Sequence, residues 1–305
     1  MYLRFMNMSE SINAFLTHLS YEKNYAALTV EAYKRDLESF HRFMIESKDL
    51  DALNPTSVDY EDCRSWMVDL SESQLSKRTI NRKMSALKSF YKFMVQQGAI
   101  DKSPLLYHRF LKMEKKSSLP FNKEELDALD QLIEVVDFES SRDALMMDLL
   151  YTSGIRRAEL IGLQLKDIDV SQQQIKVLGK GAKFRLIPVL PQTMKKLQVY
   201  LEFRSKLASN DRHLFLTSKG NKCYPNLVYR IINLYLGKVS TKLKRSPHML
   251  RHTFATHMID EGADLNTVKE LLGHSSLAAT QVYTHSSLSR LKSVYNRSHP
   301  RRKKK

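Results

Sequence analysis

Three short segments near the end of the chain decide its fold: His248-Met-Leu-Arg251-His252, Leu271-Leu-Gly273-His274 and Tyr283-Thr-His285. An arginine side chain can bind two phosphate oxygens at once and stays charged at any working pH. Histidine can give or take a proton near neutrality, and tyrosine can act as a covalent nucleophile. Together these residue types predict a site that holds a phosphodiester and attacks it without a metal.

Each of these residues also has an ordinary structural interpretation. Arg251 follows His248 by three residues, which places both on one helical face, but it could equally be a surface arginine beside a histidine at a helix start. His274 follows a glycine stop and could simply cap a helix C-terminus. Tyr283 could be a core tyrosine whose hydroxyl is satisfied inside the protein. The chemical interpretation therefore depends on the segments meeting in space.

A zinc site is disfavoured. His252 and His257 share one segment, but the glutamate of a His-Glu-x-x-His motif is missing. Cys63 and Cys223 lie far apart, and two sulfurs cannot form a cysteine-based zinc site, so we expect two structural thiols. The sequence predicts no metal and no other cofactor.

Two upstream segments add cations to the expected site. Arg156 comes directly after the break at Gly154, and Glu159 follows three residues later, so a charge-assisted bond could orient the guanidinium. Lys180 lies in a glycine-bearing turn between two segments with strand periodicity, 174–178 and 184–189, which predicts a β-hairpin. From this turn a flexible cation can reach into a site.

Composition points to a polyanionic partner. The chain has 305 residues, a formal net charge of +16 and a pI near 9.7, which favours nucleic acid first and an anionic membrane second. Its length predicts two domains. It has no apolar run of membrane-spanning length and no signal peptide, so we expect a soluble cytoplasmic protein, associated with the nucleoid in a bacterium.

The first hundred residues have helical periodicity, with Thr29 as the expected N-cap of the second helix. The fourth predicted helix, 77–97, ends before Gly98 and carries basic residues beside its apolar face: Lys77, Arg78, Arg82, Lys83 and Lys88. A solvated charged face is the plain alternative. Because no acidic residue interrupts this run, we expect a helix that faces phosphates.

The remaining boundaries follow from breaks in these patterns. Residues 111–120 are polar, basic and closed by Pro120, as in an exposed linker. Asn122 then begins a helix, with Glu125 in the capping-box position. The sequence thus predicts a mainly α protein with a small β-hairpin in its C-terminal domain. Its parts are a helical domain at 1–110, a second domain at 121–298 and a basic tail at 299–305, of which 301–305 is expected to be loosely held.

Six segments in order resemble the tyrosine recombinases, also called the phage integrase family, and among them the bacterial Xer-type site-specific recombinases. They are residues 78–90, 152–163, 179–188, 248–262, 271–285 and 294–301. The resemblance implies a SAM-like helical core-binding domain and a catalytic domain that close on DNA as a C-shaped clamp. It also implies that Arg156, Lys180, His248, Arg251 and His274 are catalytic, that Tyr283 is the nucleophile, and that Glu159 supports the arginines.

The family likeness implies a function as well. Tyr283 would form a 3′-phosphotyrosyl intermediate with double-stranded DNA, and four protomers, of one kind or of two, would exchange strands without ATP or metal. The C-terminal helix, near 287–295, would pack on a neighbouring protomer, and a DNA translocase could activate the assembly. We expect a recombinase that resolves chromosome dimers before cell division. The alternatives are an integrase or excisionase of a mobile element and a non-catalytic architectural DNA-binding protein.

Overall fold

The computed structural model describes residues 7–50, 52–113, 119–179, 184–273 and 285–301. The chain divides into two compact units, Met1–Lys116 and Ser117–Lys305. This division falls within 111–120, the range expected for the linker, while the finer boundaries stay a prediction. Among the described residues, no helix combines the length and the apolar character needed to cross a membrane.

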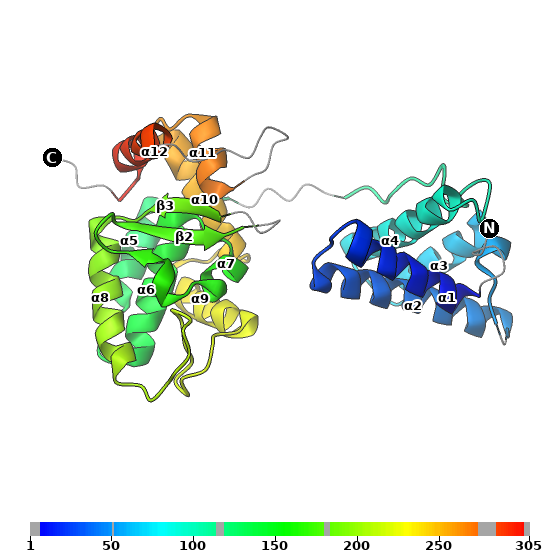
Figure 1. Ribbon diagram of the computed structural model, residues 1–305, viewed down its shortest axis with the longest axis horizontal. Coiled ribbons are helices and arrows are strands. Elements are labelled where there is room, and N and C mark those ends of the chain that lie inside the picture. The colour runs from blue at the N-terminus through cyan, green and yellow to red at the C-terminus, as the bar shows by residue number, and fades with distance from the viewer. Residues whose placement is uncertain (1–6, 51, 114–118, 180–183, 274–284, 302–305) are drawn as a thin grey trace. The chain divides into compact units, whose positions relative to one another are not determined.

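Unit 1 is a helical bundle (Figure 1). Its elements are α1 (Met8–Thr17), a π-helical turn η2 (His18–Glu22), α2 (Ala27–Lys48), a 3-10 turn η3 (Pro55–Ser57), α3 (Tyr60–Glu72) and α4 (Lys77–Gln96). The prediction that Thr29 caps α2 is wrong. Ala26 is the N-cap in extended conformation, and Thr29 lies inside the first turn, where its N–H donates to the Ala26 carbonyl. Asn24, two residues before this N-cap, has φ of 50°.

The core of unit 1 forms around α4. The apolar face expected for this helix is buried: Ile80, Met84, Leu87, Tyr91 and Met94. Beside it, Trp66 of α3 meets Phe40 of α2 edge-on, with ring centroids 5.0 Å apart. Tyr91 is fully buried, and its hydroxyl donates to the Pro55 carbonyl at 3.3 Å. The helical periodicity in the sequence therefore correctly identified the buried side of α4.

Unit 2 is mainly helical with one small sheet. Its elements are α5 (Lys123–Leu132), α6 (Phe138–Ser153), α7 (Arg157–Gly162), a 3-10 turn η4 (Leu165–Asp167), β1 (Ile168–Asp169), β2 (Gln174–Leu178), β3 (Phe184–Pro188), α8 (Pro191–Ser205), α9 (Pro225–Val239), α10 (Pro247–Asp260), α11 (Leu265–Leu272) and α12 (His285–Ser298). The capping box of Asn122 and Glu125 is present at the start of α5, as predicted. So is the antiparallel pairing of β2 with β3, while the short strand β1 was not predicted.

Helix α6 is the central element of unit 2. Nearly all of its length is buried, and it ends at Gly154, whose φ of 59° lies in the left-handed region. A Cβ at this glycine would lie 2.4 Å from the Phe254 ring of α10. Glycine is therefore required twice over, by the backbone turn and by the close approach of α10. This stop sets the direction in which the chain enters α7.

Helix α12 packs within its own chain beside β3 and α11 (Figure 1). Its residues Leu291, Val294 and Tyr295 are buried in the core of unit 2, and the Tyr295 hydroxyl donates to the Thr152 carbonyl at 2.9 Å. These three described side chains therefore belong to the chain's own core. Packing of this helix on a neighbouring protomer stays a prediction.

The tail is held more firmly than expected at its start. His299 is fully buried, and the Arg301 guanidinium donates to Asp148 Oδ1 at 2.5 Å and to the Leu126 carbonyl at 2.8 Å. The expectation of a loosely held tail is therefore wrong at Arg301, which joins Thr193 and Lys196 as a partner of the buried Asp148 carboxylate. Residues 302–305 lie outside the described part.

Candidate active site

The first arginine of the expected site lies at the start of α7. Arg156 is extended and precedes the helix, and Glu159 is its third residue. The Glu159 carboxylate accepts from the Arg156 backbone N–H at 2.7 Å and from Arg156 Nη1 at 2.8 Å. One carboxylate therefore fixes both the backbone and the guanidinium of Arg156, which is the contact that the three-residue spacing suggested.

A second arginine, which sequence reasoning missed, also pairs with the Glu159 carboxylate. Arg185 of β3 donates from Nη1 and Nη2 to the two oxygens of Glu159, at 2.8 Å each. Both side chains are 5% exposed. A signal was present in the sequence, because Arg185 takes an inward position of the strand, opposite Val177 of β2. An arginine at an inward strand position requires a buried acidic partner.

Three arginines bind the last three carbonyls of the α11 segment. Arg185 Nε donates to Leu271 O at 3.0 Å, Arg251 Nη2 to Leu272 O at 2.6 Å, and Arg156 Nη2 to Gly273 O at 3.3 Å. The final carbonyls of a helix have no partner within the helix and carry the negative end of its dipole. The end of α11 therefore gathers cations from α7, β3 and α10 immediately before His274.

Arg251 is held on two sides. It lies in α10, which begins at Pro247 behind the N-cap Ser246, and its Nη1 also donates to Gly154 O at 2.5 Å. The side chain is buried, so the interpretation of Arg251 as a surface arginine is wrong. Burial, and next the nearby charge of Arg156, lower the pKa of Arg251 to about 10. The guanidinium therefore stays charged at neutral pH.

The charges of this cluster do not cancel. Burial acts to raise the pKa of the Glu159 carboxyl, but hydrogen bonds from Arg185 and Arg156 outweigh it and hold this pKa below its usual value. The three guanidinium groups and this one carboxylate thus leave two net positive charges. Arg156 is the most open of them, with 37% of its side chain exposed. An open guanidinium backed by a second one suits a phosphate.

The remaining expected residues are placed only in part. His248 is exposed and lies in the first turn of α10, three residues before Arg251. Lys180, His274 and Tyr283 lie outside the described residues. The structure therefore brings together Arg156, Glu159, Arg185 and Arg251, and the roles of the other candidates stay predictions.

The histidines considered for a metal have other surroundings. His252 is exposed, whereas His257 is buried and its Nδ1 lies 3.0 Å from the Tyr151 hydroxyl. Burial lowers the pKa of His257. In the described part of the chain, no group of three or more His, Cys, Asp or Glu side chains could hold a metal ion. The contacts of His257 are those of a core histidine that packs α10 against α6.

The basic residues of α4 fall into two groups. Lys77 and Arg78 are exposed at the start of the helix. Arg82 and Lys83 both pair with Asp36 of α2, and Lys83, only 13% exposed, also lies over the Trp66 ring at 5.6 Å. Lys88 is half-buried, 5.7 Å from the Phe110 ring. This geometry favours Lys77 and Arg78 over Lys83 for contact with DNA phosphates.

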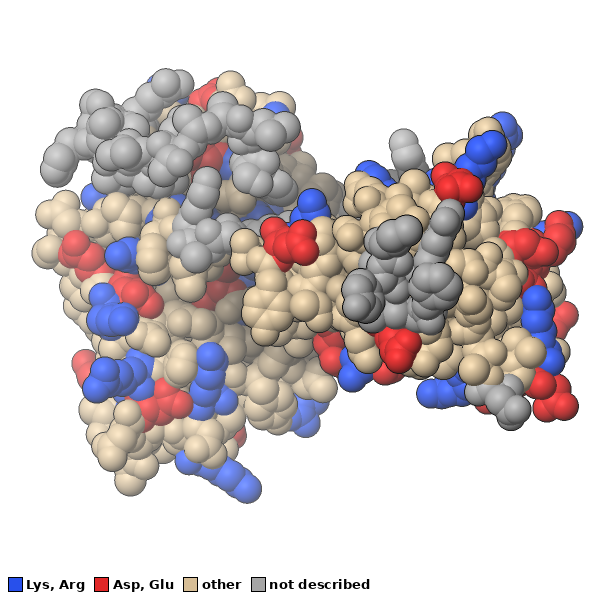
Figure 2. All heavy atoms as spheres, turned by 45° about the vertical axis from the view of Figure 1, so that its right-hand side comes forward, with Lys and Arg blue, Asp and Glu red and all other residues tan. Residues whose placement is uncertain are grey.

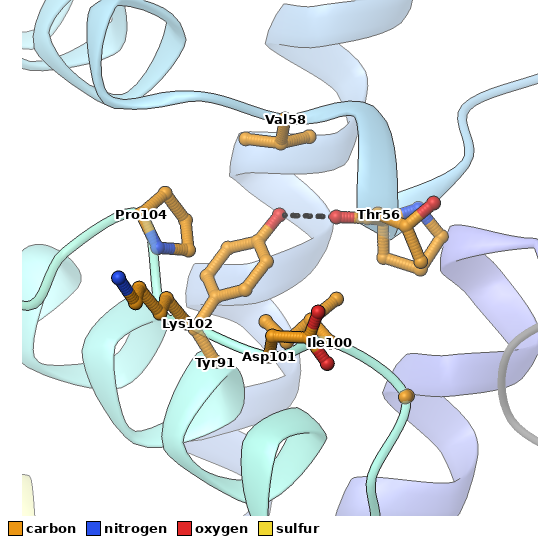
Figure 3. Close-up of a pocket in the computed structure, with 9 residues that line it drawn as sticks. Thr56, Val58, Tyr91, Ile100, Asp101, Lys102 and Pro104 are labelled. Atoms are coloured by element: carbon orange, nitrogen blue, oxygen red, sulfur yellow. Dashed lines mark hydrogen bonds between the residues drawn. The ribbon is translucent and has the colours of Figure 1, made fainter.

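Unit 1 also has a pocket of about 440 Å³ between η3 and the segment that follows α4. Figure 3 shows the Tyr91 ring at its base, with Val58, Lys102 and Pro104 around it. None of the expected site residues that the structure describes lines this pocket. Figure 2 shows basic side chains interspersed with acidic and uncharged ones on the visible surface of each unit, so neither visible surface is uniformly basic.

Comparison with known proteins identifies the family to which this fold and sequence are similar. Residues 121–290 match the phage integrase family, and residues 12–98 match the family's N-terminal SAM-like domain. Relatives named tyrosine recombinase XerC include one from Chlorobaculum tepidum, 37% identical over 95% of this chain and 94% of the relative. Another is from Bacillus pumilus, 38% identical over 97% and 98%.

Solved structures agree in fold. The Tn1549 transposon integrase in complex with transposon right end DNA has a TM-score of 0.70 at 20% identity, covering 94% of this chain and 99% of that one. XerH recombinase bound to its difH substrate has a TM-score of 0.67 at 23% identity, covering 92% and 82%. The mainly helical fold class and the resemblance noted in the sequence are thereby confirmed, and the chain belongs to the phage integrase family.

Proposed function

We propose that this chain is a tyrosine recombinase that cuts and rejoins double-stranded DNA at a specific site through a 3′-phosphotyrosyl link to Tyr283. Its strongest structural support is the meeting of Arg156 and Arg251 at the end of α11, directly before the segment that carries His274 and Tyr283. Relatives that share more than a third of the sequence over almost their whole length are named tyrosine recombinases.

The two arginines bind the nonbridging oxygens of the scissile phosphate. Arg156 offers its open side, and Arg251 is anchored by Gly154 O and Leu272 O, so it is already oriented before DNA arrives. Preorganised donors stabilise charge that builds on phosphorus in the transition state without any cost of rearrangement. No metal or other cofactor is needed for this step.

The remaining groups move protons. The pKa of a free phenol is about 10, so Tyr283 needs a base, and His248, in the first turn of α10, takes its proton. The phenolic oxygen bonds to phosphorus while the bond to the 5′-oxygen breaks. Lys180 protonates that oxygen, and His274 donates a hydrogen bond to the phosphate. A 5′-hydroxyl from the partner duplex then reverses these steps, so no ATP is consumed.

Binding places the duplex on the basic side of α4. Lys77 and Arg78, with Arg82 and Lys88 beside them, contact backbone phosphates, and the two domains close around the DNA as the expected clamp. Contacts of this kind release counterions and make affinity fall steeply with salt. Binding of this kind places the protein with the chromosome, in the cytoplasm.

The biological role proposed is resolution of chromosome dimers before cell division. It is supported by the relatives' name, XerC. Two sites are held by four protomers, from one recombinase or from two, and a DNA translocase is a candidate activator. The competing role, integration or excision of a mobile element, makes a different prediction. Mapping of bound sites in the cell should give one locus near the replication terminus rather than the ends of an element.

A nicked suicide substrate tests the proposal against a purely architectural DNA-binding role. A nick near the scissile phosphate lets the released fragment diffuse away and traps the covalent intermediate. The recombinase should form a protein–DNA adduct that survives denaturant, whereas an architectural protein binds the same DNA without forming one.

A further inference from the structure

The Glu159 carboxylate is fully engaged. It accepts four hydrogen bonds, one from the Arg156 backbone N–H, one from Arg156 Nη1 and two from Arg185. The Arg185 guanidinium bonds both carboxylate oxygens, whereas the Arg156 guanidinium bonds only one of them. Arg156 uses one nitrogen for Glu159 and the other for Gly273 O, at the longer distance of 3.3 Å.

Exposure separates the two arginines. Arg185 is 5% exposed, with all three of its guanidinium nitrogens bonded inside the protein, whereas Arg156 is 37% exposed. Arg185 is therefore closed to a ligand and Arg156 is open to one. The charged groups that face Glu159 in the described part of the site are Arg156 and Arg185, with Arg251 beyond them.

We propose that Arg185 is a positioning residue for DNA cleavage: it compensates the charge of Glu159, so that Arg156 presents its full positive charge to the scissile phosphate. This inference rests on the proposed function. Through its bond to Leu271 O, Arg185 also fixes β3 against the end of α11, the segment that leads to His274. Arg185 itself does not touch DNA.

Charge balance explains why such a residue is needed. The phosphodiester carries one negative charge, and its five-coordinate transition state carries two. With Arg185 present, the cluster has two net positive charges. Without it, the buried Glu159 would neutralise Arg156 and leave one. Loss of one preorganised electrostatic group at a reacting centre typically costs about 100-fold or more in rate.

The test uses Arg185→Met, which keeps side-chain length and removes the charge. We expect single-turnover cleavage of a nicked suicide substrate, at saturating DNA, to slow by about 100-fold, with DNA affinity unchanged. The same reaction is then run with a methylphosphonate at the scissile position, which lacks one negative charge. On this methylphosphonate substrate, the ratio of the unmodified protein's cleavage rate to that of Arg185→Met should be at least tenfold smaller. The reason is that its transition state carries one negative charge less and so needs less positive charge from the protein.

Two further variants separate this role from plain loss of structure. Arg142→Met removes a buried arginine that is paired with Asp143 in α6. Its defect, if any, should be equal on both substrates. The double variant Glu159→Gln/Arg185→Met returns the cluster to two net positive charges and should cleave the ordinary substrate at least tenfold faster than Arg185→Met. Thermal unfolding of each variant shows whether it is folded.

The outcomes distinguish the two proposals. Absence of any adduct with the unmodified protein overturns the proposed function. If the unmodified protein cleaves, an equal Arg185→Met defect on both substrates overturns only the inference about Arg185. So does a double variant no faster than Arg185→Met. Should Arg185→Met fail to fold, the double variant alone decides. Cleavage by the double variant at nearly the rate of the unmodified protein supports charge compensation. A rate at least 100-fold below that of the unmodified protein contradicts it.

Discussion

Arg251 Nη2 donates to the carbonyl oxygen of Leu272 at 2.6 Å, which joins the second turn of α10 to the last turn of α11. The same guanidinium holds the Gly154 carbonyl, where α6 ends. One buried side chain thus ties together three segments that are far apart in the sequence. The cation expected to bind phosphate is therefore also a structural tie, so its substitution should affect both stability and cleavage.

Arg251→Lys should retain the charge but lose one of the two carbonyl contacts, because an ammonium group cannot span both acceptors as a guanidinium does. We expect a loss of about 1–3 kcal/mol in the free energy of unfolding, because one buried carbonyl is left without its hydrogen-bond donor. Cleavage should fall by about 100-fold or more as one oriented donor is lost. Urea unfolding and suicide-substrate cleavage measure the two effects. Cleavage at the normal rate would contradict the assignment of Arg251 to the site.

Gly154→Ala should destabilise unit 2 and displace the carbonyl that Arg251 binds. The added Cβ meets the Phe254 ring at 2.4 Å, on top of the strain of φ 59°. Gly262→Ala is the matched control, because φ there is 85° and no atom lies within 4 Å of the new Cβ. We expect Gly262→Ala to cost about 1 kcal/mol in unfolding free energy and Gly154→Ala several times more. Equal losses would show that the contact with α10 is not tight.

His299 should make the stability of unit 2 depend on pH. Burial, and next the charge of Arg301, lower its pKa from 6.5 to about 3. Between these values the unfolded chain binds a proton that the folded chain does not, so stability falls as pH drops from about 6.5 toward 3, by up to about 1.4 kcal/mol per pH unit. His299→Phe should flatten this part of the profile, as measured by urea unfolding at several pH values. An unchanged slope would show that His299 does not cause it.

Lys77 and Lys83 should respond differently to removal of charge. Lys77→Gln removes an exposed cation, so DNA affinity should fall, and the slope of log affinity against log salt should become shallower by about one. Lys83→Gln removes a partner of the buried Asp36, so it should lower stability and leave the salt slope unchanged. Binding titrations at several salt concentrations decide between them. A larger slope change for Lys83 would place the DNA on a different side of α4.

Much of the fold follows from local pattern. The β2–β3 pairing is recognisable because strand periodicity on both sides of a glycine-bearing turn leaves few other arrangements. The capping box of Asn122 and Glu125 and the stop at Gly154 depend on neighbouring residues alone, so the sequence displays them directly. The same holds for the bond between Arg156 and Glu159, which lie one helical turn apart.

The remainder depends on contacts between distant segments. Arg185 lies 26 residues from Glu159 and 86 from Leu271, and no periodicity connects such positions. Lys83 belongs to a basic run, yet Asp36 of another helix draws it inward. Arg301 looks like part of a charged tail until Asp148 of α6 is seen beside it. In each case a buried carboxylate pairs with a cation from a distant part of the sequence, which is a tertiary effect.

The proposed function depends above all on attack by Tyr283 on a phosphodiester held by Arg156 and Arg251. The most direct measurement incubates the unmodified protein and Tyr283→Phe with a nicked suicide substrate in the presence of EDTA, followed by denaturing electrophoresis. We expect a covalent protein–DNA adduct with the unmodified protein, none with Tyr283→Phe, and equal DNA binding by both. An adduct formed by Tyr283→Phe, or cleavage that requires an added metal ion, would contradict the proposed function.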